Sequence, residues 1–461
     1  MTDLTFDQPA LRRTPWLIET RALLVLAAPM AMAQLAHMAV MTTDVILLGR
    51  LGRAELAAAA IGNTVYYMAW LLGSGPGMAV SPVIAQILGA RPRDRTSVRA
   101  TVRMGLWVTM LASLPLMLLM FNARWILLHL GQDPQLAAGA GVFVAMLAFG
   151  LPFTLGYQAL RSFSAALGKP GATLWVMLAT IVFNGVAGYG LIFGKFGLPA
   201  LGLMGSGLAT AGSSIFSFVA MLVVVRLTPK LHAYRILRRA HRPVPVKAKE
   251  LVRLGAPIGV TMIFEAMLFN TMTLVMGTFG AIAVAAHQIA LNFASITFMV
   301  PLGFAMASTV RVGLAVGRGD MVAARRAGVT AMVLATGFIS MVAVAMMLFG
   351  EQIAGLYLGS GRAGDEAVIV LAVQFLLVAA AFQIFDALQV VGAHALRGLK
   401  DARMPMVLAG VSYWLAGAPV CILLGVVLKM QGLGIWIGLA FGLAVAAGAM
   451  CWRFWRITRV I

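Results

Sequence analysis

The stretch AGVTAMVLATGFISMVAVAMMLF, residues 327 to 349, decides the fold class of this chain. It contains no charged residue, and it is long enough to cross a bilayer, since a spanning helix needs about 20 mainly apolar residues. The strands of a membrane barrel instead alternate apolar and polar residues over about ten positions. The stretch therefore predicts a membrane-spanning helix and an all-α polytopic membrane protein.

The composition of the whole chain agrees with this prediction. Of the 461 residues, 61% are hydrophobic and 11% are charged, whereas soluble domains carry about 25% charged residues. An ordinary soluble enzyme and a disordered chain are both excluded. The net charge of +20 does not indicate nucleic-acid binding, because long apolar runs separate the cations. The two cysteines, Cys421 and Cys451, lie in apolar stretches and indicate neither a disulfide framework nor a thiol metal site.

The same length criterion predicts twelve spans. They cover residues 22–47, 54–80, 98–121, 137–160, 172–194, 200–225, 252–277, 281–310, 327–349, 366–395, 405–428 and 433–452. The first twenty residues lack an apolar core and are not expected to be a signal peptide.

The Lys and Arg residues test this count, because cytoplasmic loops collect them. Both termini and the even-numbered connections hold 29 of the 35, and the odd-numbered connections hold 6. The split predicts that both termini lie in the cytoplasm. No Lys or Arg falls in the middle of a predicted span.

The two halves of the chain repeat one another. Ala28-Pro29 matches Ala256-Pro257 at a spacing of 228 residues, and Gly207-Leu208-Ala209 matches Gly438-Leu439-Ala440 at a spacing of 231. We therefore predict two pseudo-symmetric six-helix bundles, and such repeats typically place a substrate site between the halves and alternate access by rocking. The predicted parts are an N-terminal lobe over 1–227, a cytoplasmic basic linker over 228–250 and a C-terminal lobe over 251–461.

Prolines have two open interpretations in this scheme. The Ala-Pro pairs either mark bending points inside the first helix of each lobe or begin those helices near the cytoplasmic surface. Pro243 and Pro245 are expected to break any helix in the linker.

Two acids, Glu265 and Asp386, lie well inside predicted spans. An ionised group at the bilayer centre costs about 2.5–3.5 kcal/mol on insertion scales, so such residues normally face a cavity and serve a function. The alternative is a protonated acid that hydrogen-bonds a neighbouring helix for packing. Asp44 stands near a helix end, where it either joins the site or faces water. We predict Glu265, Asp386 and Asp44 as cation-coupling residues.

Helical spacing predicts what surrounds these acids. Polar, aromatic and methionine side chains share their faces, and a polar stripe on the eighth span suits only an inward face. The predicted substrate-cavity residues on these faces are Gln34, His37, Met41, Met262, Phe269, Gln288, Asn292, Ser295, Phe382 and Gln389. Because no mid-span cation balances the acids, the predicted partner is Na⁺, H⁺ or a cationic organic molecule. His37, His287 and His394 are given no ligand role.

At these residues the sequence resembles a known family. PIGVTMIFEAMLFNTMTL (257–274), AAHQIALNFASITFMVPLGFAMASTVRVGLAVGRGD (285–320) and FQIFDALQVVGAHALRGLKD (382–401) look like the seventh, eighth and tenth helices of the NorM-type branch of the multidrug and toxic compound extrusion (MATE) family. The resemblance continues through TTDVILLGRLG (42–52) and FNGVAGYGLIFG (183–194) and covers nearly the whole chain.

The resemblance implies a bacterial inner-membrane efflux pump that exports amphipathic cationic compounds in exchange for inward Na⁺ or H⁺. It places the family's cation-site acids at Glu265 and Asp386, which would hold Na⁺ in a sodium-coupled pump, and its first-helix acid at Asp44. Asn184 stands where the related DinF-type branch tends to have Asp, and we include it among the cavity residues. The family's site can include a Tyr one turn before the tenth-helix acid; Phe382 stands there, which weakens the argument for Na⁺.

Other functions are weighed against this one. A lipid-linked oligosaccharide flippase of the same superfamily would need a cationic cavity or two extra spans, and a passive channel would show flux without countertransport. An enzyme or an ATP-driven pump is not expected, because the sequence has no HExxH motif, no GxxxxGK[ST] loop and no embedded Ser/His/Asp arrangement. The expected partners are the bilayer, cationic amphipathic molecules and the coupling ion, with no cofactor, nucleic acid or ATP.

Overall fold

The computed structural model describes residues 15–238, 242–358 and 365–459. In this part of the chain the regular elements are all helices. The first half contains α1 (Pro15–Leu51), α2 (Arg53–Ala90), α3 (Arg95–Phe121), α4 (Ala123–His129), α5 (Pro134–Ala166), α6 (Gly171–Phe193), α7 (Gly202–Leu227) and α8 (Pro229–His232). The second half contains α9 (Pro245–Gly277), α10 (Ala281–Gly317), α11 (Met321–Leu348), α12 (Gly350–Gly355), α13 (Asp365–Gly398), α14 (Arg403–Gly410), α15 (Ala418–Ile422) and α16 (Gln431–Ile457).

Among the described residues, 12 helical segments are long and apolar enough to cross a membrane, which confirms the predicted count. The eleventh segment is composite: α14 and α15 alternate with two π-helical stretches, η1 (Val411–Gly417) and η2 (Leu423–Val427). Several helices are longer than their predicted spans, and α10 continues seven residues beyond position 310, to Gly317. The apolar window marks only the lipid-facing length, while the polar ends continue the helix.

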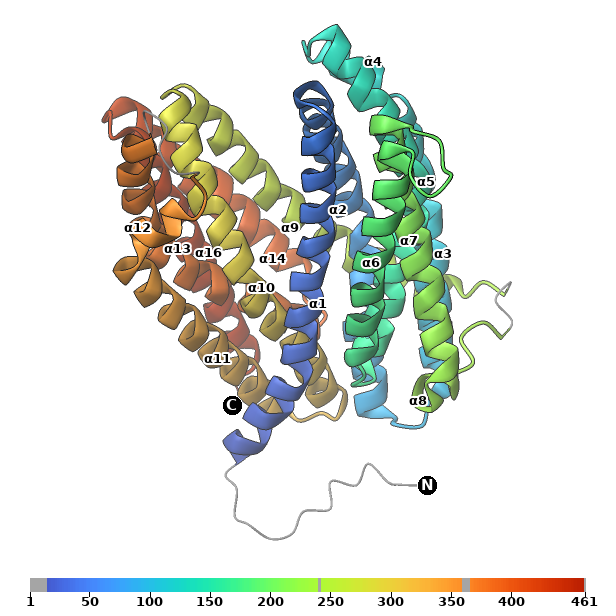
Figure 1. The fold of residues 1–461 in the computed structure, drawn as a ribbon. Helices are drawn as coiled ribbons and strands as arrows, with labels where there is room; N and C mark the ends of the chain where they lie inside the picture. Colours follow the sequence, from blue (N-terminus) through green and yellow to red (C-terminus); the bar gives the residue numbers. More distant parts are fainter. Residues whose placement is uncertain (1–14, 239–241, 359–364, 460–461) are drawn as a thin grey trace.

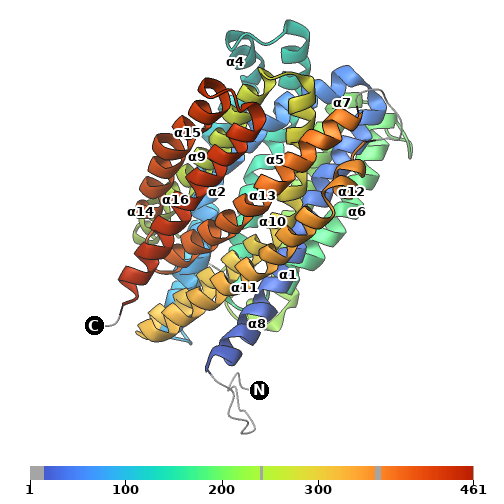
Figure 2. The ribbon, with the colours of Figure 1, turned by 90° about the vertical axis from the view of Figure 1, so that its left-hand side faces the viewer.

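The helices form two bundles, α1 to α7 and α9 to α16 (Figure 1). Figure 1 shows α1 and α2 between them, with the bundles spreading apart toward the end that carries α4 and converging toward the end that carries α8. Seen from the second bundle, α11, α13 and α16 run side by side at a common tilt (Figure 2). We call the bundles the N-terminal and the C-terminal lobe.

The two lobes exchange the first halves of their first helices. Leu23 and Met30 of α1 pack in one cluster with Phe304 of α10 and Val391 of α13, which belong to the C-terminal lobe. Residues Leu251, Leu254 and Ile258 of α9 pack instead with the core of the N-terminal lobe. Each lobe therefore holds a segment of the other near its converging end.

Glycines allow the backbones of the lobes to approach closely at this end. A Cβ atom on Gly75 of α2 would lie 2.1 Å from the carbonyl oxygen of Gly255 of α9. A Cβ atom on Gly89 of α2 would lie 2.9 Å from the Cα atom of Gly317 of α10. A larger residue at these positions would force the helices apart.

Polar contacts close the same end. Arg311 of α10 donates two hydrogen bonds to the Glu19 carboxylate of α1, from Nε at 2.8 Å and from Nη2 at 2.6 Å. Gln86 of α2 donates from Nε2 to the Gly398 carbonyl of α13 at 2.9 Å. These contacts join the N-terminal lobe to the C-terminal lobe.

The structure shows where the prolines lie in the helices. Pro29 and Pro257 lie inside α1 and α9, so the interpretation as helix starts is wrong. Figure 1 shows α1 bending in the half that contains Pro29. The expectation that Pro245 breaks a helix is also wrong, because Pro245 is the first residue of α9, where the missing N–H has no helical partner to lose.

Candidate ion and substrate site

Glu265 of α9 and Asp386 of α13 lie close enough in the C-terminal lobe to interact electrostatically. Asp386 is only 7% exposed, and its Oδ1 atom has no hydrogen-bond partner among the described residues. A buried carboxylate oxygen without a partner is costly unless a cation or a proton occupies it. The structure thus brings together the two acids that the sequence placed inside spans.

A buried arginine accompanies the two acids, and this corrects the expectation that they lack a countercharge. Arg397 is 8% exposed and lies within electrostatic reach of Glu265. Its Nη1 atom is 3.0 Å from Nε2 of His394. The sequence window ended the span at 395 and so assigned Arg397 to a connection, but α13 continues to Gly398 and keeps this side chain inside the protein.

Tyr413 is a site residue that the sequence analysis missed. It is fully buried, its hydroxyl has no partner among the described residues, and it interacts electrostatically with Glu265, Asp386 and Arg397. Tyr413 lies in η1, and single π-helical turns frequently occur at functional sites. A hydroxyl group thus faces the acids although position 382 has none.

Neutral amides add further oxygen and nitrogen atoms. Gln383 accepts a hydrogen bond from Thr297 Oγ1 at 3.1 Å. The Oε1 atom of Gln389 is buried without a partner. No group of three or more His, Cys, Asp or Glu side chains in the described part of the chain is arranged to hold a metal ion. A cation site here would therefore combine two carboxylates with neutral oxygens, which suits a hard cation.

An aromatic residue stands one helical turn from each acid, Phe269 after Glu265 and Phe382 before Asp386. Phe269 and Phe382 pack edge to face with ring centroids 5.9 Å apart, and Phe382 contacts Trp436 at 5.5 Å. His287 contacts the same Trp436 ring and lies 3.1 Å from Thr273 Oγ1, in agreement with a packing role. Phe269 and Phe382 thus lie beside each other in the core of the C-terminal lobe.

Asp44 belongs to a separate site in the N-terminal lobe. Its Oδ2 atom accepts a hydrogen bond from Thr210 Oγ1 of α7 at 3.0 Å. Asn184 of α6 is fully buried and lies beside the same carboxylate. The Oδ1 atom of Asp44 is buried and has no hydrogen-bond partner in the described part of the chain. Asp44 and Asn184 are thus brought together, and Thr210 is an additional member that the sequence analysis missed.

Gln34 and His37 surround a second buried arginine. Arg161 of α5 is 9% exposed and donates hydrogen bonds to Oε1 of Gln34 and, at 3.3 Å, to the sulfur of Met306 on α10. His37 lies within electrostatic reach of it. The sequence assigned Arg161 to a connection, but α5 extends to Ala166. Its partners among the described residues are uncharged, so this cation is buried between the lobes without a carboxylate from that part of the chain.

The remaining predicted cavity residues are distributed over the surfaces of α1, α9 and α10. Met262 is partly buried and packs against the core of the N-terminal lobe. Asn292 accepts a hydrogen bond from the hydroxyl of Tyr357 at 3.1 Å. The exposed members of the predicted set are Met41, Gln288, Asn292 and Ser295. They do not pack with the acid pair in this arrangement of the lobes.

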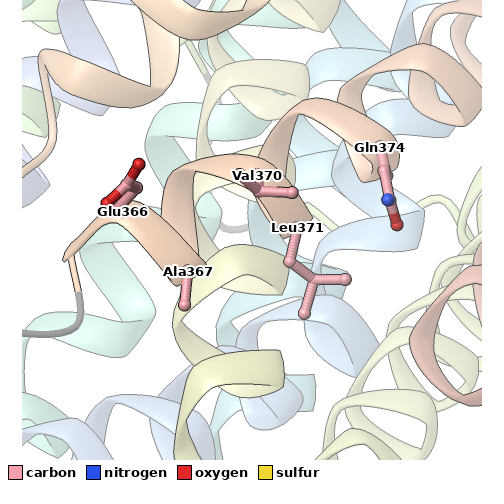
Figure 3. A pocket seen from close by; sticks show the side chains of 5 residues that line it. All are labelled: Glu366, Ala367, Val370, Leu371 and Gln374. Atoms are coloured by element: carbon pink, nitrogen blue, oxygen red, sulfur yellow. The ribbon is translucent and has the colours of Figure 1, made fainter.

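Two hollows of the molecular surface lie away from the acids. One is lined by the start of α13, where Leu371 and Gln374 point to the same side (Figure 3). The other lies between α9 and the composite eleventh helix and is lined mainly by apolar residues, among them Met272 and Trp414. Neither hollow is lined by Glu265, Asp386 or Asp44.

Twelve membrane-spanning helices in two related lobes, with a buried acid and a half-buried acid inside one of them, define a multi-pass membrane transport protein. The comparisons make this specific. The chain belongs to the MatE family, whose sequence model matches residues 29–190 and 257–423, one range in each lobe.

Relatives and solved structures agree with the assignment. The chain is 42% identical over 446 residues to a probable multidrug resistance protein NorM of Mesorhizobium japonicum, which covers 96% of this chain and 95% of that protein. It is 41% identical to a probable multidrug resistance protein NorM of Rhizobium meliloti, over 96% of this chain and 95% of that protein. The fold is similar to that of a eukaryotic MATE transporter, with a TM-score of 0.83 and 23% identity over 96% of this chain and 99% of that one.

Proposed function

We propose that this protein is a secondary active multidrug efflux transporter that exports amphipathic cationic compounds in exchange for Na⁺ or H⁺. The observation that carries the proposal is the pair of the half-buried Glu265 and the buried Asp386, which interact electrostatically with each other and with Tyr413, while Arg397 interacts with Glu265. The names of the relatives, which are called probable multidrug resistance proteins, support the substrate class. They do not favour a lipid-linked oligosaccharide flippase.

Charge balance suggests how the exchange works. When both carboxylates are ionised, Arg397 balances one of them, and one negative charge is left in a low-dielectric interior. One monovalent cation neutralises it, and lobes close around a neutral cluster at lower free energy than around a bare charge. The entering ion and a cationic compound then compete for the same charge.

The membrane potential favours inward ion movement. Each positive charge that moves inward contributes about 2.3 kcal/mol per 100 mV. The charge split predicts both termini in the cytoplasm of a bacterium, with the protein in the inner membrane. In that orientation the lobes converge on the cytoplasmic side and spread apart on the outer side (Figure 1), so an ion entering from outside meets the open end.

Alternating access by rocking completes the proposal. The glycine contacts of Gly75 and Gly89, together with the Glu19–Arg311 ion pair, would separate when the cytoplasmic end opens. Arg161, buried between the lobes, would then reach water, and the recovered hydration would favour the inward-open state.

Flux measurement in proteoliposomes tests the function. The purified protein is reconstituted with a fluorescent lipophilic cation, and a Na⁺ gradient or a pH gradient is imposed separately with the membrane potential clamped. We expect one of the gradients to drive the dye against its own gradient. Dye movement that only follows its own gradient would identify a passive channel and overturn the proposal.

A further inference from the structure

Cations gather where the segment after α7 folds back on the N-terminal lobe. Tyr234 anchors that segment: it is 8% exposed, its ring packs edge to face on Phe163 at 5.8 Å, and its carbonyl oxygen accepts a hydrogen bond from Arg99 Nε at 2.8 Å. Leu231 and Ile236 are buried in the same core. The surface formed around this anchor, here called the basic surface, consists of Arg95, Arg99, Lys169, Lys230, Arg235 and Arg242.

The members of the basic surface lie close to one another. Lys169 and Lys230 interact electrostatically, and partial burial together with this neighbour lowers the pKa of Lys230. Arg99 and Arg242 both lie near Arg103. Like charges at short range repel each other, so an arrangement of this kind is stabilised by an anion from outside the chain.

No carboxylate of the described residues forms an ion pair with the basic surface. Asp94, adjacent to Arg95 in sequence, instead caps α3: it accepts hydrogen bonds from Ser97 N at 2.9 Å and from Ser97 Oγ at 2.7 Å, which lower its pKa. Asp94 thus caps the N-terminus of α3 and does not pair with the basic surface.

Several cations at the same end of the C-terminal lobe have intramolecular partners. Arg453 pairs with Asp401 at 2.6 Å, and Lys400 pairs with Glu250 at 2.8 Å. Arg325 lies over the Trp455 ring at 3.3 Å. These pairs neutralise part of the charge at that end, whereas the closely placed cations of the basic surface share no ion pair with a described carboxylate.

The depth of the basic surface indicates the source of the anion. Lys169 and Lys230 each stand three residues beyond the end of a spanning helix, Ala166 of α5 and Leu227 of α7. This is the level of the headgroups, which extend a bilayer from about 30 Å of hydrocarbon to about 40–45 Å in total. Leu227 is apolar, stands next to these cations and is 76% exposed. A phospholipid bound by its phosphate would place its acyl chain against such a side chain.

We infer that the basic surface binds the phosphate headgroups of anionic phospholipids in the leaflet on its side of the membrane. The lipid supplies the negative charge that no described carboxylate provides here, because anionic headgroups attract Lys and Arg side chains close to the leaflet. The N-terminal lobe thereby binds the lipids of this leaflet through the basic surface, whichever ion drives transport.

Native mass spectrometry of the purified full-length chain tests the inference independently of transport. The probes are phosphatidylglycerol, phosphatidylcholine with the same acyl chains, and inorganic phosphate. The variant carries Lys169→Gln, Lys230→Gln, Arg235→Gln and Arg242→Gln. The matched control removes four exposed charges at the same end of the C-terminal lobe, with Arg318→Gln, Arg403→Gln, Arg456→Gln and Arg459→Gln.

We expect the wild type and the control to prefer phosphatidylglycerol over phosphatidylcholine by about tenfold or more, and the variant to lose this preference. The smaller variant with Lys169→Gln and Lys230→Gln should lose part of it. Equal losses in variant and control would show unspecific attraction and overturn the inference. Displacement of the lipid by inorganic phosphate at equal concentration would assign the surface to a soluble anion and overturn it as well.

Discussion

The two lobes differ most clearly at one equivalent position. The spacing of 228 residues that relates Ala28-Pro29 to Ala256-Pro257 also relates His37 to Glu265. Each of these side chains lies within electrostatic reach of a buried arginine, Arg161 in the N-terminal lobe and Arg397 in the C-terminal lobe. At this equivalent position the N-terminal lobe thus has an excess cation and the C-terminal lobe has an excess acid. Under the proposed function, ion coupling would therefore belong to the C-terminal lobe, and the following predictions test that division.

The largest effect is expected from the acid pair. Glu265→Gln or Asp386→Asn removes the net negative charge of the cluster, so the coupling ion loses its main attraction and efflux should fall to the level of cells without the protein. Substrate accumulation in intact cells measures this. Glu351→Gln, at an exposed acid of α12, is the control and should leave efflux unchanged. Wild-type efflux by either pair variant would contradict the exchange mechanism.

A smaller effect is expected in the N-terminal lobe. Asp44→Asn removes the charge but keeps a partner for Thr210, whose hydrogen bond to a charged group is worth about 1.5–3 kcal/mol. We expect drug resistance to decrease by about tenfold, since 1.4 kcal/mol corresponds to that factor. Thr210→Val should lower it in the same direction. Unchanged resistance in both variants would assign Asp44 to a structural role.

The next largest effect is expected at the contact between the lobes. Glu19 is 7% exposed and accepts two hydrogen bonds from Arg311, so Glu19→Gln should weaken the closed cytoplasmic end and lower the unfolding temperature. A double-mutant cycle of Glu19→Gln and Arg311→Gln should give a coupling free energy of about 1–3 kcal/mol. The thermal unfolding of purified protein measures it. Additive single effects would show that the pair does not hold the lobes together.

The smallest effect is expected at Tyr413. Tyr413→Phe removes a hydroxyl that has no partner among the described residues. If the hydroxyl contacts the ion, the apparent ion affinity in transport assays should drop by about two- to tenfold, the value of one hydrogen bond. A purely structural hydroxyl would give the opposite pattern, with a raised unfolding temperature and unchanged ion affinity.

The twelve spans follow directly from hydropathy, because about 20 apolar residues in water-free surroundings must be helical. The sequence also placed Glu265 and Asp386 inside the bundle, because an acid in an apolar run has few other stable positions.

Two kinds of site residue could not be predicted from the sequence pattern. Arg161 and Arg397 stand just beyond the apolar windows, and only the continuation of α5 and α13 shows that these helices carry them inward. Tyr413 lies in a π-helical turn, where the usual 3.6-residue spacing does not predict which side chains share a face. In both cases the local helix geometry, rather than the composition, decides where the side chain points.

The exchange of helix halves between the lobes affects the order in which the protein can be assembled during synthesis. Leu23 and Met30 of α1 are made first, yet their packing partners span Phe304 to Val391 in the second half of the chain. Until the ribosome has passed those residues, this part of α1 has only lipid or its own lobe to contact. The first helix to be inserted is therefore among the last to reach its native environment.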